Sequence, residues 1–212
     1  MRTRVVLALS AALMLLISLA AIGSNMGFKI TIAMPASVAK YISLPYYVTL
    51  DGNPSPTAAN LRNEIVAAAG GSAACTVYNW TGTTWQRWSG GGLGQTNFLL
   101  TAGTGYQVVA GQACNLVVVG SHNPSATVSL PASVAKYVAP PYHSTDATAA
   151  AFRNELIAAA GGSAACTVYN WTGTTWQRWS GGGLGQVNFT VAPGTAYQVV
   201  LSQATGWTPA HY

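Results

Sequence analysis

The residue types that most often act in catalysis or metal binding are few in this chain, and their spacing does not match that of a catalytic or metal-binding site. His122, His143 and His211 stand at no ligand-like spacing from one another or from a cysteine, whereas a zinc site needs about four converging donors. No serine lies in a nucleophile-elbow context, and Gly90–Gly94 lacks the lysine and the strand–loop–helix setting of a phosphate-binding loop. We therefore predict no metal, no cofactor and no enzymatic activity.

One unit occurs twice along the chain. Pro35–Tyr41 recurs as Pro131–Tyr137, and the 29 residues Ala67–Gln95 recur without change as Ala158–Gln186. The displacement falls from 96 to 91 residues because a surface loop between these segments is longer in the first copy. Self-similarity of this kind indicates tandem homologous domains.

Charge is scarce as well. The 212 residues include nine Lys or Arg and four Asp or Glu, and 7 Trp and 10 Tyr accompany a 50% apolar composition. A disordered chain is poor in aromatic residues, and a nucleic-acid-binding protein carries dense basic stripes, so the composition excludes both classes. Glu64 and Glu155 occupy the same position of the repeat, and we interpret them as surface or helix-start residues.

Cysteine usage suggests a structural role. Cys75 and Cys166 are the same position in the two copies, whereas Cys114 has Thr205 as its counterpart. Disulfides can form in an exported chain, and we predict one between Cys75 and Cys114. Cys166 is then either a buried apolar side chain or the site of an intermolecular bridge.

An aromatic hairpin is the most distinctive surface candidate. A register with Trp80 opposite Trp85 also sets Val77 opposite Trp88 on the other face, which we expect to enter the core. The outer face favours sugar stacking or a protein contact, unless a helix or loop covers its rings. The predicted aromatic surface comprises Tyr78, Trp80, Trp85 and Arg87 in the first copy and Tyr169, Trp171, Trp176 and Arg178 in the second.

The elements that must position these residues follow from periodicity. Phe28–Met34 alternates between apolar and other residues, as a half-buried strand does. A helix begins at Thr57, aligns Leu61, Ile65 and Ala68 on one face, and ends at a Gly-Gly pair. Further strands are predicted over residues 38–44, 75–80, 85–89, 97–101, 106–110 and 116–119.

Each copy is therefore about seven short, mostly antiparallel strands with one helix. We predict a mainly β, α+β fold in which two sandwich-like tandem domains occupy residues 24–121 and 122–212.

Residues 1–23 are typical of a secretory signal peptide. Arg2 and Arg4 precede the apolar run Val5–Ile22, which ends in a small-residue cleavage site. An uncleaved membrane anchor is the alternative, because the run approaches spanning length. Cleavage would leave a secreted protein, extracellular or at the cell surface, without membrane attachment.

The predicted mature chain begins and ends at the point of the repeat where the first copy passes into the second. A head-to-tail contact between two subunits would therefore reproduce the junction between the two copies. Such heterologous contacts grow into filaments unless their rotation closes. The first strand begins with more apolar residues than its counterpart, which favours its addition to a neighbour's sheet edge; packing on its own domain is the alternative. The predicted subunit interface comprises Met26, Phe28, Ile30, Trp207, Pro209 and Tyr212.

Five segments carry a resemblance to known proteins: Lys40–Tyr46, the Thr-Ala-rich helix after it, the tryptophan hairpin, Gly103–Tyr106 and Gly206–Tyr212. They resemble tandem β-rich repeat domains of exported bacterial proteins of unassigned role. The resemblance covers nearly all of the mature chain, and its motifs are structural, so it carries no catalytic residue over. The chain departs from that pattern at Leu61-Arg62, where we expect a cysteine, so the resemblance lends no support to a disulfide.

The sequence thus predicts an exported structural protein, with copies of itself as partners, that assembles head to tail into an extracellular filament or surface layer. Its low charge fits a protein packed against its own copies. The alternative is a secreted carbohydrate-binding or adhesive module that binds polysaccharide through the exposed Trp and Tyr faces. Neither nucleic acid nor, after signal cleavage, a membrane is an expected partner.

Overall fold

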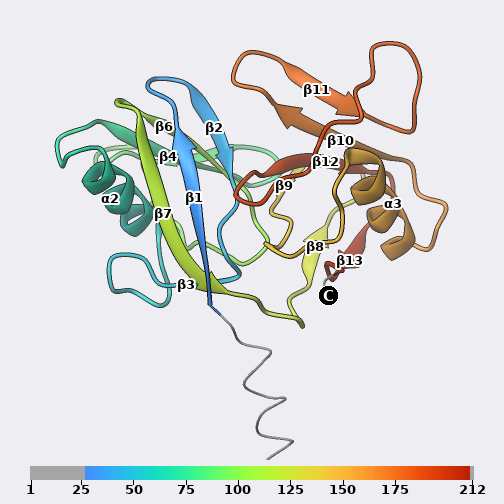
Figure 1. The fold of residues 1–212 in the computed structure, drawn as a ribbon, viewed down its shortest axis with the longest axis horizontal. Helices are drawn as coiled ribbons and strands as arrows, with labels where there is room; N and C mark the ends of the chain where they lie inside the picture. The colour runs from blue at the N-terminus through green and yellow to red at the C-terminus, as the bar shows by residue number, and fades with distance from the viewer. Residues whose placement is uncertain (1–26, 211–212) are drawn as a thin grey trace, which may run out of the picture.

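The computed structural model describes residues 27–210 and shows a mainly β, α+β protein (Figure 1). It has 39% strand and 12% helix, with several antiparallel sheets, which confirms the predicted fold class. The predicted signal peptide lies outside the described residues. Among the residues described, no helix has the length and apolar character needed to cross a bilayer.

The elements follow the sequence repeat, which we call repeat 1 (residues 24–121) and repeat 2 (residues 122–212). Repeat 1 contains β1 (Phe28–Met34), β2 (Ala39–Ile42), β3 (Tyr47–Val48), α2 (Ala58–Ala68), β4 (Cys75–Trp80), β5 (Trp85–Trp88), β6 (Tyr106–Ala110) and β7 (Cys114–Ser121). Repeat 2 contains β8 (Val128–Leu130), β9 (Lys136–Val138), α3 (Ala149–Ala159), β10 (Cys166–Trp171), β11 (Trp176–Trp179), β12 (Tyr197–Leu201) and β13 (Thr205–Trp207).

The first strand has the alternation expected from its sequence. Ile30, Ile32 and Met34 are buried, and the residues between them are exposed. The strand pairs along its whole length, antiparallel, with β7. The short strand β3, which the sequence pattern did not reveal, pairs with the far end of β7.

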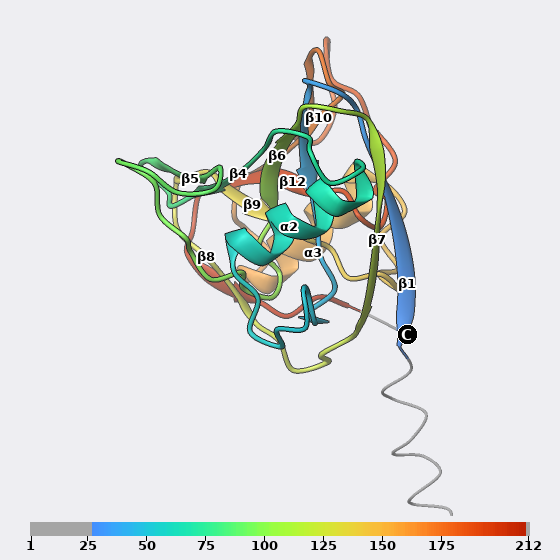
Figure 2. The ribbon, with the colours of Figure 1, turned by 90° about the vertical axis from the view of Figure 1, so that its left-hand side faces the viewer.

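Two sheets and a helix enclose the core of repeat 1. The sheets have the strand orders β1-β7-β3 and β2-β6-β4-β5, and repeat 2 has the corresponding orders β13-β8 and β11-β10-β12-β9. Helix α2 contacts both β4 and β7, so it closes one side between the two sheets (Figure 2). The buried apolar residues form one cluster drawn from repeat 1, another drawn from repeat 2, and a small third cluster of Tyr41, Tyr137 and Ala196 that draws on both.

Helix α2 begins and ends where the sequence predicted. The Asn60 side chain accepts a hydrogen bond from the backbone N–H of Thr57, the N-cap, at 3.0 Å. Gly70 and Gly71, with φ values of +91° and +89°, end the helix. Ala58, rather than the predicted Ala68, completes its buried face with the leucine and isoleucine.

The predicted strand over residues 97–101 is wrong. The segment runs past the start of α2, where the Phe98 carbonyl accepts a hydrogen bond from the Ala58 N–H at 2.9 Å. The Asn97 side chain accepts another from the Ala59 N–H at 2.8 Å. The backbone of this segment is therefore hydrogen bonded to the helix start rather than along a strand, and the Phe98 ring stacks on Tyr106 of β6.

Candidate functional site

The β4–β5 hairpin has the predicted register. All four expected cross-strand pairs are present, from Val77 opposite Trp88 to Trp80 opposite Trp85. Val77 is fully buried, and Trp88 packs against the core of repeat 1. The β10–β11 hairpin of repeat 2 has the same register.

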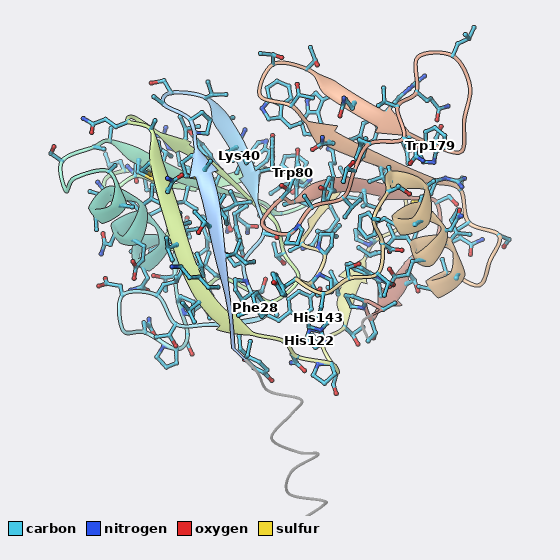
Figure 3. All side chains as sticks on the ribbon, viewed as in Figure 1. Phe28, Lys40, Trp80, His122, His143 and Trp179 are labelled. Carbon is cyan, nitrogen blue, oxygen red and sulfur yellow. The ribbon has the colours of Figure 1, made fainter. Side chains whose placement is uncertain are left out.

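The other face of each hairpin meets the other repeat. Trp80 Nε1 donates to the Ala135 carbonyl at 2.9 Å, and Trp171 Nε1 donates to the Ala39 carbonyl at 3.0 Å. The two contacts are reciprocal, because both the donors and the acceptors are equivalent positions of the repeat. Reciprocal contacts of this kind relate the two repeats by an approximate two-fold axis. Figure 3 places Trp80 at the junction between the repeats.

Backbone hydrogen bonds across the junction obey the same symmetry. They form two equivalent pairs, and together with the indole hydrogen bonds they fix the orientation of one repeat on the other. The first pair joins Ser43 N to Gly194 O at 3.1 Å and Ala139 N to Gly103 O at 2.9 Å. The second pair joins Gly105 N to Tyr137 O at 3.0 Å and Ala196 N to Tyr41 O at 3.2 Å.

Tyr41 and Tyr137 stack on each other at the centre of the junction. Their ring centroids are 4.8 Å apart and their planes differ by 9°. The two hydroxyl groups are hydrogen bonded to each other, and Gln107 Nε2 donates to Tyr41 Oη at 3.1 Å. Burial raises the pKa of both tyrosines, so both phenols stay neutral at physiological pH.

Trp85 remains accessible at the edge of this junction. Its side chain is 40% exposed, yet its ring contacts three others: Trp80 at 5.2 Å, Tyr78 at 6.3 Å and Tyr137 of repeat 2 at 5.4 Å between centroids. We call this arrangement the Trp85 platform. The equivalent Trp176 platform has a tryptophan that is 41% exposed and contacts Trp171 at 5.2 Å, Tyr169 at 6.5 Å and Tyr41 at 5.3 Å.

The structure brings together the eight residues of the predicted aromatic surface as two groups of four. Arg87 and Arg178 are exposed beside the two platforms. The sequence analysis missed Tyr41 and Tyr137, which each repeat supplies to the other's platform. The available signal was the recurrence of the Pro-Ala-Ser-Val-Ala-Lys-Tyr segment that contains them.

The described members of the predicted subunit interface are engaged within their own chain. Phe28 stacks on Tyr142 of repeat 2 with centroids 4.3 Å apart and planes 12° apart. Ile30, Trp207 and Pro209 are buried. The remaining two predicted residues, Met26 and Tyr212, lie outside the described part of the chain.

The structure contains Cys75, Cys114 and Cys166 as free thiols, so the Cys75–Cys114 disulfide is not formed in it. Cys75 and Cys166 are buried, and burial raises the pKa of each thiol to about 11. Cys114 packs against the core, and its thiol contacts the Ile65 carbonyl at 3.8 Å. Thiols with raised pKa values carry little thiolate and are poor nucleophiles.

A carboxyl pair in repeat 2 escaped the sequence analysis. Glu155 Oε1 accepts hydrogen bonds from Trp207 Nε1 at 2.9 Å and from the Ala210 N–H at 2.5 Å. Burial, followed by the hydrogen bond and the charge of Glu155, raises the pKa of Asp146 to about 8. The interpretation of Glu155 as a surface residue is therefore wrong, whereas Glu64 accepts from a backbone N–H of an exposed loop.

A hollow of about 260 Å³ lies beside the longer loop of repeat 1. It holds no carboxylate, histidine, lysine or cysteine, so its chemistry is limited to apolar contact and a few hydroxyl groups. The lining residues are Leu44–Val48, Pro54–Pro56 and Leu99–Ala102.

The described residues contain no cluster of three His, Cys, Asp or Glu side chains that could hold a metal ion. His122 and His143 make an edge-to-face contact with ring centroids 4.1 Å apart, and His211 lies outside the described residues. No protein-family model matches the chain, and no curated protein or solved structure matches it either. Inference about function therefore starts from the aromatic platforms.

Proposed function

We propose that the protein is an exported carbohydrate-binding, adhesive module that stacks sugar rings on Trp85 and Trp176. One observation carries the proposal: the two indoles stay 40% and 41% exposed although each is held by three other rings. A solitary surface tryptophan would have to be ordered on binding. Rings that are already fixed avoid most of that entropic cost.

The neighbouring side chains suit sugars as well. The apolar C–H face of a pyranose packs on a flat indole, and nearby polar donors set its orientation. Arg87 and Arg178 supply such donors at the edge of each platform, in cross-strand register with Tyr78 and Tyr169.

Affinity electrophoresis of the processed protein in gels containing soluble polysaccharides tests this proposal. We expect retardation by at least one polysaccharide, and at least about tenfold weaker binding for the double variant Trp85→Ala/Trp176→Ala, which corresponds to about 1.4 kcal/mol of lost contact. Leu93→Ala and Leu184→Ala are the matched controls, because both leucines are fully exposed outside the platforms. Equal retardation of platform variants and wild type would refute the proposal.

Self-assembly into a filament or surface layer is a second candidate function, favoured by the outer face of the β1–β7 sheet. Val117 and Val119 are 46% and 60% exposed there, opposite Thr31 and Lys29 of β1. Uncovered apolar side chains on a sheet are common at contacts between proteins. Since β1 already pairs with β7, we propose contact through this face rather than donation of the first strand.

Light scattering and negative-stain microscopy of the processed protein test this second candidate. We expect growth of the particles with concentration, and its loss in the double variant Val117→Lys/Val119→Lys. Particles that stay monomeric at millimolar concentration would contradict it. The glycan measurements are unaffected by that outcome, because the valines and the platforms are separate surfaces.

A further inference from the structure

We propose that the two platforms bind separate segments of acidic polysaccharide, so that one molecule cross-links two glycan chains. This inference rests on the proposed carbohydrate binding and adds the charge of the ligand and the number of chains bound. It follows from where the charges lie and from the symmetry of the junction.

The first argument is electrostatic. Arg87 and Arg178 are exposed beside the indoles, in cross-strand register with Tyr78 and Tyr169. The platforms themselves contain no carboxylate.

The four carboxylates of the chain are placed elsewhere. Glu64 and Glu155 belong to α2 and α3, and Asp51 and Asp146 to the segments that precede these helices. Glu64 and Asp51 bind groups of that same region, and Glu155 holds the end of the described chain. Cationic aromatic surfaces from which anions are absent complement uronic acid residues, whose carboxylates pair with arginine and whose rings stack on tryptophan.

The second argument concerns the space between the platforms. Three ring contacts lead from Trp85 through Tyr137 and Tyr41 to Trp176. The two tyrosines in the middle are only 6% and 7% exposed. The surface therefore offers two separate stacking sites, joined beneath by buried rings, rather than one continuous strip.

The third argument is symmetry. A polysaccharide chain has a chemical direction, and a two-fold axis reverses it. Two equivalent platforms therefore make equivalent contacts only with segments that run in opposite senses. Two chains, or two distant segments of one chain, satisfy this condition without a tight reversal of the glycan.

The junction also fixes the two sites relative to each other. Four backbone and two indole hydrogen bonds cross it, so the platforms cannot turn to face a single chain. Rigid bivalency of this kind bridges ligands when the geometry forbids both sites from engaging one short segment.

Polygalacturonate is the probe, and dextran, a neutral chain, is its control. The processed protein is mixed with each polysaccharide; binding is measured by affinity electrophoresis and cross-linking by turbidity and sedimentation. The variants are Trp85→Ala, Trp176→Ala, their combination, and Arg87→Gln/Arg178→Gln, which alters only exposed side chains. Leu93→Ala/Leu184→Ala is again the matched control, and circular dichroism checks the fold of each variant.

We expect wild type and the leucine control to bind polygalacturonate and sediment it, with at least about tenfold weaker binding at high salt, where arginine–carboxylate attraction is screened. Each single tryptophan variant should retain binding through its intact platform and lose sedimentation. The double tryptophan variant should lose both, and the arginine variant should weaken binding to polygalacturonate at least about fivefold, or about 1 kcal/mol.

Three results would overturn the inference while leaving the proposed function intact. Equal binding to dextran would show that the ligand need not be acidic. Binding without sedimentation, or sedimentation by the single tryptophan variants, would show that the two platforms do not cross-link glycan chains. If the protein binds neither polygalacturonate nor dextran, this inference is overturned. If it binds none of the wider set of polysaccharides, the proposed function is overturned as well.

Discussion

Asp146 and Glu155 form the most unusual contact between two side chains in repeat 2. Glu155 holds the indole of Trp207 and the backbone of Ala210 through one carboxylate oxygen. Its other oxygen and Asp146 Oδ2 are buried without another partner, which fits a proton shared between the two carboxyl groups. A neutral Asp146 therefore lets Glu155 bind Trp207 and Ala210 without a repelling negative charge beside it.

This pair predicts that stability falls with rising pH. The pKa of Asp146 is about 8 in the folded protein against an ordinary 3.8, so between these values the folded state binds a proton that the unfolded chain has lost. The contribution of Asp146 is complete below pH 3.8 and disappears as pH rises through about 8. We expect the Asp146→Asn variant to show a flatter decline of unfolding free energy over this window.

Urea denaturation at a series of pH values measures that difference. Asp51→Asn, which changes an exposed carboxylate of repeat 1, is the matched control. Parallel slopes for wild type and Asp146→Asn would show that the proton is not retained in the folded state.

At the scale of elements, each helix start is stabilised by an asparagine 38 residues away in sequence. Asn97 Oδ1 accepts from the Ala59 N–H at 2.8 Å, and Asn188 Oδ1 accepts from the Ala150 N–H at 2.8 Å. The first N–H groups of a helix have no partner within the helix, so a distant side chain can act as the cap. The chain after each glycine-rich loop thereby becomes tied to the helix.

We expect Asn97→Ala and Asn188→Ala each to lower the free energy of unfolding by about 1 kcal/mol, as loss of a helix cap does. Chemical denaturation monitored by circular dichroism measures the change. Asn154→Ala, an exposed substitution within α3, serves as the control and should stay within about 0.5 kcal/mol of wild type. A cap variant no less stable than this control would rule out the capping role.

Local elements were predictable because their determinants are local. The hairpin register follows from alternation and a four-residue turn, and α2 follows from Thr57 and its Gly-Gly end. Residues 97–101 misled the analysis because Phe98 is buried by stacking on Tyr106, whereas the backbone of this segment is hydrogen bonded to the start of α2 rather than along a strand. Spacing of apolar residues reports burial and does not identify the element that provides it.

At the scale of the whole molecule, the junction between the repeats lay beyond the sequence analysis. Trp80 and Trp171 were predicted as surface rings, yet each donates to a backbone carbonyl of the other repeat. Tyr142, which stacks on Phe28, is likewise far from it in sequence. Contacts between segments 50 or more residues apart depend on how the two repeats dock, and no periodicity within either repeat encodes that docking.

The reciprocal junction predicts matched effects of matched substitutions. We expect Trp80→Phe and Trp171→Phe to destabilise the protein by similar amounts, about 1–2 kcal/mol each beyond the loss of ring volume, because each leaves a carbonyl at the junction without its donor. Trp88→Phe supplies the volume reference, since its indole N–H makes no hydrogen bond in the described part of the chain. Thermal and chemical denaturation compare the three variants.

Destabilisation by only one of the two junction variants would contradict the two-fold relation. Effects no larger than that of Trp88→Phe would instead show that the indole hydrogen bonds add nothing to the docking of the repeats.

Joining the two repeats in one polypeptide also changes how their docking responds to dilution. Separate polypeptides held by these same reciprocal bonds would dissociate once their concentration dropped below the dissociation constant. A peptide linker replaces that dependence with a constant local concentration. The paired tryptophan faces therefore stay assembled in a single molecule, however thinly the protein is spread.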